Sequence, residues 1–186
     1  MSAKKPYFKD RRSAVISTMV VVFLLVLGLL AIDSNNVRRL GGYQAKVDQL
    51  QKTVESQMEA RFAYAASLAS LLDDEQQARE VIAITDAFEE AGSIERQSEL
   101  YRLLDDELAM LQRTLFADPA YVQYAPYFEK MYEVEQQLGV SIASYNEGVE
   151  FYNRQIQAFP ANLVAKRRNF DLLGFYTIAS ALQGRP

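Results

Sequence analysis

The stretch PYFEKMYEVEQQLGVSIASYNEGVEFYNRQIQAFP, residues 126–160, decides the fold of this 186-residue chain. From Leu138 to Phe159, apolar side chains recur at alternating gaps of four and three residues. This heptad pattern predicts a long helix packed lengthwise on other helices. Pro126 is expected in its first turn, and Pro160 is expected to end it. The expected buried face consists of Phe128, Met131, Leu138, Ile142, Tyr145, Val149, Tyr152, Ile156 and Phe159.

A second apolar seam lies upstream and predicts another long helix. Its members are Leu40, Tyr43, Val47, Leu50, Val54, Tyr64, Leu68 and Leu71. Gly41 and Gly42 weaken this helix, because each glycine costs about 1 kcal/mol in a helix interior. They are interpreted either as a hinge or as a close contact with a neighbouring helix, and both alternatives stay open.

Two shorter helical patterns separate the seams. Asp73 and Gln76 match a capping box at the start of the first. Ser93 is the expected N-cap of the second, which ends at Ala117-Asp118-Pro119. Because the connections are short, successive helices are expected to be antiparallel neighbours.

Residues 13–32, SAVISTMVVVFLLVLGLLAI, contain no charged side chain. At ~1.5 Å per residue, such a helix spans a hydrocarbon core of about 30 Å. A cleaved signal peptide is the alternative, but the stretch is long and no Ala-x-Ala site follows it. We therefore predict an uncleaved transmembrane helix.

Flanking charges predict the orientation of this helix. Residues 1–12 carry a net charge of +4, and residues 33–39 carry +1. The excess of Lys and Arg favours a cytoplasmic N-terminus in the inner membrane, with the rest of the chain in the periplasm. The opposite topology is the alternative, since Arg38 and Arg39 also resist export.

These patterns predict an all-α protein: an N-terminal single transmembrane helix followed by an elongated antiparallel four-helix bundle. The expected divisions are a basic flank (1–12), the transmembrane helix (13–32), the bundle (33–165) and a basic-then-apolar tail (166–186). The tail begins with Lys166-Arg167-Arg168. It either rests on anionic lipid or folds back over the bundle, and we favour the second.

Composition argues against catalysis, because the chain contains no His and no Cys. The commonest general base, thiolate nucleophiles and most transition-metal ligands are therefore missing. Acidic runs such as Asp105-Asp106-Glu107 are interpreted as solvated faces. We expect no enzyme activity, cofactor or metal. Residues 33–159 carry a net charge of −11, which argues against nucleic acid as a partner.

Two charged residues fall on the expected buried seams. Glu135 lies on the downstream seam, and Arg61 lies on the upstream one. A buried charge is costly unless it is paired. We predict that Arg61 and Glu135 form a buried ion pair that sets the register of the helices and does not catalyse a reaction.

The end of the long helix carries a motif. Tyr145-Asn146 and Tyr152-Asn153 lie seven residues apart, and Phe159-Pro160-Ala161-Asn162-Leu163 follows. This arrangement resembles the signature of the LemA family, a Tyr-Asn-x-x-Val-x-x-Tyr-Asn helix end followed by Phe-Pro-x-Asn-Leu. The resemblance covers nearly the whole chain. It departs from the family at Ala66-Ser67-Leu68-Ala69, where Pro-Asn-Leu-Val is usual. The motif residues are Tyr145, Asn146, Tyr152, Asn153, Phe159, Pro160, Asn162 and Leu163.

The resemblance implies a membrane-anchored helical bundle of bacteria with no established enzyme activity. Members are associated with envelope stress, with membrane proteases and, in one branch, with magnetosome formation. Many are described with the N-terminus outside, opposite to the orientation that the charges favour. We expect a non-catalytic scaffold or adaptor for other envelope membrane proteins. The alternative is a self-associating structural protein that organises or remodels membrane. The expected partners are the lipid bilayer and another membrane protein or a second copy.

Overall fold

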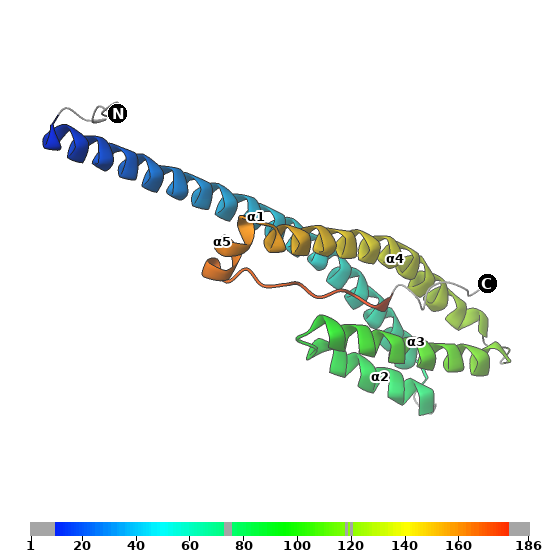
Figure 1. Ribbon diagram of the computed structural model, residues 1–186. Coiled ribbons are helices and arrows are strands. Elements are labelled where there is room, and N and C mark those ends of the chain that lie inside the picture. The colour runs from blue at the N-terminus through cyan, green and yellow to red at the C-terminus, as the bar shows by residue number, and fades with distance from the viewer. Residues whose placement is uncertain (1–9, 73–75, 118, 120, 179–186) are drawn as a thin grey trace, which may run out of the picture.

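The computed structural model describes residues 10–72, 76–117, 119 and 121–178, and all regular structure in these ranges is helical. Figure 1 shows an elongated molecule in which the first half of α1 projects from one end of a helical body. An extended segment after α5 returns along that body; we call residues 170–178 the C-terminal strap. The helices are α1 (Arg11–Ala69), α2 (Gln76–Glu89), α3 (Ile94–Phe116), α4 (Tyr121–Gln157) and α5 (Ala161–Arg168).

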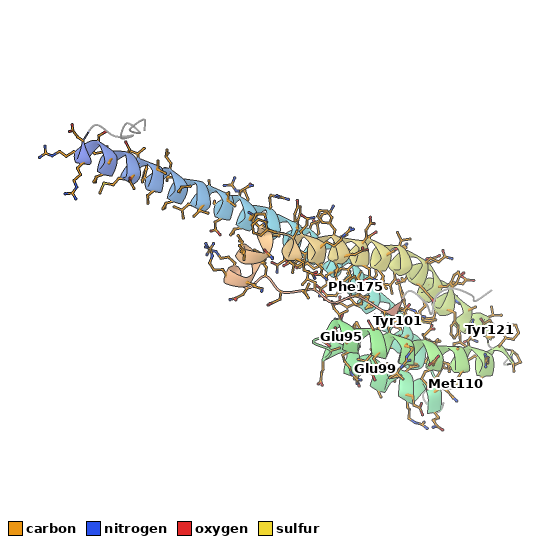
Figure 2. All side chains as sticks on the ribbon, viewed as in Figure 1. Glu95, Glu99, Tyr101, Met110, Tyr121 and Phe175 are labelled. Atoms are coloured by element: carbon orange, nitrogen blue, oxygen red, sulfur yellow. The ribbon has the colours of Figure 1, made fainter. Side chains whose placement is uncertain are left out.

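Helix α1 joins the apolar segment to the body as one helix of 59 residues. An 18-residue window near its N-terminus is apolar enough to cross a membrane, and none of that window is buried. In Figure 2 the side chains of this half project on all sides with no other element beside them. By length and composition, this part of α1 therefore fits a membrane anchor.

Gly41 and Gly42 do not interrupt α1, since the helix continues through both. A Cβ atom added to either glycine would meet no atom within 4 Å. Within the described residues, neither glycine therefore makes the close contact with a neighbouring helix of this chain that was one of the two predicted alternatives.

The buried face of α1 follows the predicted seam at Leu40, Val47, Val54 and Leu68. Tyr64 and Leu71, which were also expected on it, are exposed. The face passes through Met58, Arg61 and Ala65 instead. A straight helix drifts by about 20° per heptad, so a seam extrapolated at fixed gaps leaves the true contact face.

The predicted face of α4 is buried at seven of its positions. Phe159 is exposed, because α4 ends at Gln157. Helix α4 starts at Tyr121, so Pro126 lies inside the helix and not in its first turn. The hydrogen bond that Pro126 lacks would end at Val122, an exposed residue that water can reach. The buried positions are Met131, Leu138, Ile142, Tyr145, Val149, Tyr152 and Ile156.

Helix α1 packs along α4, and α2 packs on both α1 and α3. Helices α3 and α4 do not pack along their lengths, and the C-terminal strap runs between them. The Tyr176 ring of the strap meets the Tyr145 ring of α4 edge-on, with centroids 5.1 Å apart. Its hydroxyl donates to Gln97 of α3 at 2.9 Å. The all-α class is confirmed, whereas a closed four-helix bundle is not.

Several predicted features lie at or beyond the limits of the described residues. Asp73, the expected cap of α2, lies outside them, as do residues 1–9 and 179–186. The expected cap of α3 is present, because the Ser93 hydroxyl accepts a hydrogen bond from the Arg96 N–H at 3.2 Å.

Candidate functional site

Arg61 lies on the buried face of α1 with only 3% of its surface exposed. Its Nη2 donates to Asp105 Oδ1 of α3 at 2.8 Å and to Glu135 Oε2 of α4 at 3.3 Å. The guanidinium carbon also lies 4.4 Å from the centre of the Tyr101 ring. The fold thus brings Arg61 and Glu135 together and adds Asp105 as a third charged member.

This charge cluster joins three helices through one cation. The Asp105 and Glu135 side chains are 5% and 14% exposed. Desolvation offsets much of the attraction in such a cluster, so its net contribution to stability is small. Its geometry is demanding, because Arg61 must face both carboxylates at once. That requirement supports the register hypothesis, which stays a prediction.

Asp105 was interpreted as part of a solvated acidic run, and for this residue the interpretation is wrong. A usable signal was present: Asp105 lies four residues after Tyr101 and three before Leu108, which are both buried. Asp106 is exposed, as expected. The pKa of Glu107 is raised, first by desolvation and then by Glu80 of α2. Within the described ranges, no three acidic side chains are grouped so that they could hold a metal ion.

A cleft of about 400 Å³ opens beside the charge cluster, between α1, α3 and α4. Arg61 and Glu135 belong to its wall. Figure 2 shows Tyr121 at the end of the body opposite the apolar half of α1. The cleft is therefore distant from the apolar segment, and its wall combines carboxylates with aromatic rings. The rings are those of Tyr121, Phe128 and Tyr132.

Two motif asparagines on α4 hold the C-terminal strap. Asn146 Nδ2 donates to the Tyr176 carbonyl at 2.8 Å, and its Oδ1 accepts from the Tyr176 N–H at 3.0 Å. Asn153 makes the same two bonds to Leu173, both at 3.0 Å. Each carboxamide thus satisfies one donor and one acceptor of the strap, as a neighbouring β-strand would.

The spacing of these asparagines matches the strap. Asn153 lies seven positions after Asn146 in the helix, which is about 10.5 Å along the axis. Leu173 and Tyr176 are three residues apart, which is about 10 Å in extended chain. A pair of asparagines one heptad apart is therefore in register with every third residue of an extended segment.

Of the motif tyrosines, Tyr145 packs against the strap. Tyr145 donates its hydroxyl to the Gly174 carbonyl at 3.0 Å. Burial first, and Glu55 second, raise the pKa of Tyr145 to about 12. Burial also raises the pKa of Tyr152, with a smaller effect from Asp171. A Cβ atom on Gly174 would lie 3.1 Å from Glu95 Oε1, so the strap passes beside the Glu95 side chain of α3 here.

The remaining motif residues form the turn into α5. Pro160 is the N-cap of α5, and Asn162 Oδ1 is buried without a hydrogen-bond partner among the described residues. Phe159 and Leu163 are exposed. The tail therefore behaves in two ways: its apolar part folds back as the strap, while Lys166-Arg167-Arg168 stays exposed.

The sequence profile of the LemA family matches residues 44–186. The chain belongs to the LemA family. The match begins after the apolar part of α1 and covers the charge cluster, the cleft and the strap. Within this LemA region, Tyr145, Asn146 and Asn153 of α4 form hydrogen bonds with the strap. Comparisons with curated proteins and with solved structures give no match.

Proposed function

We propose that this LemA-family protein is a non-catalytic scaffold or adaptor, anchored in the membrane by α1, that binds other bacterial envelope proteins. The observation that supports this role is the cleft beside Arg61. It is open to water and lined by aromatic rings. Aromatic residues are enriched where proteins bind one another, because they bury a large area with few rotatable bonds.

The length of α1 restricts where a partner binds. At ~1.5 Å per residue, α1 rises about 43 Å from Ile32 to Arg61. A partner in the cleft is therefore a domain or peptide outside the bilayer. In the proposed orientation the N-terminus is cytoplasmic and the body lies in the periplasm, which the +4 charge of residues 1–12 supports. The opposite orientation is the alternative.

Photo-crosslinking in intact membranes tests the cleft. A photoreactive residue replaces Tyr132, which lines the cleft, or Val140, which is exposed on α4 away from it. We expect a discrete unrelated protein to crosslink at position 132 and not at position 140. Equal yields at the two positions, or no product at position 132, would contradict this role for the cleft.

A self-associating, membrane-organising protein is the second candidate. A groove of about 570 Å³ between α1 and α4 favours it. Tyr43 and Phe151 line this groove, with Lys46, Glu147 and Arg154 beside them. A surface that carries both signs of charge suits a two-fold contact between identical copies. A photoreactive residue at position 151 that yields only self-crosslinks would support this candidate over the first.

A further inference from the structure

Helix α5 lies at the level of α1 where its apolar half ends. The exposed apolar side chains of α1 stop at Ile32, and Asp33 follows. Arg167 of α5 pairs with Asp33, and Arg168 Nη2 lies 4.0 Å from the same carboxylate. Figure 1 shows α5 at the end of the body from which the apolar half of α1 projects. If residues 13–32 span the bilayer, these ion pairs place α5 at the headgroup layer.

The fold gathers cations at this boundary from two distant parts of the sequence. All of them are exposed, whereas the body as a whole is acidic. Asp33 of α1 is already paired with Arg167, and Asp171 follows α5 in the sequence. The surface is therefore locally positive beside the bilayer. The cations are Arg38, Arg39, Lys166, Arg167 and Arg168.

Large apolar side chains accompany these cations. Phe159 is 81% exposed and Leu163 is 62% exposed, although both belong to the family motif. The opposite face of α5 packs on the body through Val164 and Ala165. Apolar side chains beside Lys and Arg are typical of segments that lie at the boundary between headgroups and acyl chains.

We propose that the α5 foot, which we define as residues 159–168, binds anionic phospholipid headgroups together with Arg38 and Arg39. The guanidinium groups pair with lipid phosphate, a geometry for which arginine is suited. Phe159 and Leu163 contact the upper acyl chains. This site requires that α1 is anchored in the bilayer and does not require that the protein is a scaffold.

Lipid enrichment around the full chain tests the proposal. The chain has no Cys, so a Cys introduced at the exposed Ser34 carries the only fluorophore. Nanodiscs contain phosphatidylcholine and phosphatidylglycerol, with the acceptor dye on one lipid or the other. We expect energy transfer to report several-fold enrichment of phosphatidylglycerol. The variant K166Q/R168Q should bring this enrichment close to the bulk ratio while Arg167 keeps its pair with Asp33.

A matched variant controls for total charge. Lys52 and Lys130 are exposed on the body, and K52Q/K130Q removes the same charge away from the foot. This control should leave the enrichment unchanged, and F159S/L163S should lower it. Raising the salt concentration should also lower the enrichment around the parent protein, because salt screens the attraction between exposed charges. Equal enrichment in the foot and body variants, or no preference for phosphatidylglycerol in the parent protein, would overturn the proposal.

Discussion

At the scale of single residues, the position of Arg61 places the strictest requirement on the packing of the body. It is a buried cation whose nearest charged groups lie on two other helices, Asp105 on α3 and Glu135 on α4. Hydrophobic side chains of similar volume in place of all three charged groups would fill the same space with little loss of stability. Such hydrophobic side chains would no longer require these three helices to meet at one point.

Replacing Arg61 by methionine should lower the free energy of unfolding by about 3–5 kcal/mol, because two buried carboxylates lose their cation. Chemical denaturation of the full chain in detergent, followed by circular dichroism, measures this change. The triple variant R61M/D105N/E135Q should recover much of the loss. R113M, on an exposed part of α3, should change stability by less than about 0.5 kcal/mol. A similarly small effect of R61M would show that the cluster does not constrain the fold.

The motif tyrosines should make the folding stability of the protein depend on pH in the alkaline range. Because burial raises the pKa of Tyr145 from 10.0 to about 12, the folded protein favours the neutral phenol. This stabilisation is complete below about pH 10 and is lost as the pH rises toward 12. Urea denaturation between pH 7 and pH 12 should show this fall.

The variant Y145F should be less sensitive to alkali, although about 1 kcal/mol less stable at neutral pH through loss of the bond to Gly174. Some sensitivity should persist, since burial also raises the pKa of Tyr152 and of Tyr176. An unchanged alkaline profile in Y145F would show that Tyr145 does not contribute to it.

At the scale of elements, the C-terminal strap takes the place that a direct contact between α3 and α4 would have. Among the described residues, its backbone groups have no strand to pair with, and α4 supplies Asn146 and Asn153 instead. Helix α4 and the strap are therefore joined by hydrogen bonds between side chains of the helix and backbone groups of the strap. Residues of many types would be tolerated at exposed strap positions such as Leu172 and Phe175.

Removing the two carboxamides should release the strap. In N146A/N153A we expect the amide hydrogens of Leu173 and Tyr176 to exchange much faster, because the carboxamide oxygens that accept them are lost. The loss of stability should be about 1–3 kcal/mol for each substitution, since backbone groups become unpaired. N35A, on an exposed part of α1, is the control. Unchanged exchange in the double variant would show that the strap is held by its side chains alone.

The helices were predictable from sequence because each buried face recurs every three or four residues, as it does from Leu138 to Ile156. The folding back of the tail was expected from the sequence. The extended shape of the strap and its pairing with Asn146 and Asn153 were not, since a short extended segment has no periodic pattern. Asn146 and Asn153, polar residues beside a buried seam, were the available signal. The burial of Asp105 was not predicted, because its acidic neighbours suggested a surface exposed to water. Only its position relative to Tyr101 indicated that it is buried.

At the scale of the whole molecule, if residues 13–32 span a bilayer, the uninterrupted α1 determines how the body is placed relative to that bilayer. The α5 foot lies beside the end of the apolar segment, and the cleft lies at the opposite end of the body. The length of α1 between these levels is about 40 Å. A scaffold built in this way would hold its partner clear of the lipid surface.

Energy transfer to headgroup-labelled lipids tests this central claim most directly. Single cysteines at Val122, exposed at the start of α4, and at Leu163, exposed on the α5 foot, carry the donor in otherwise Cys-free chains. With a dye pair whose range is about 30 Å, position 163 should show strong transfer and position 122 very little. The reason is that about 40 Å of α1 lies between the level of the α5 foot and the level of the cleft. Strong transfer from position 122 would contradict the account, since it would mean that the body lies down on the bilayer.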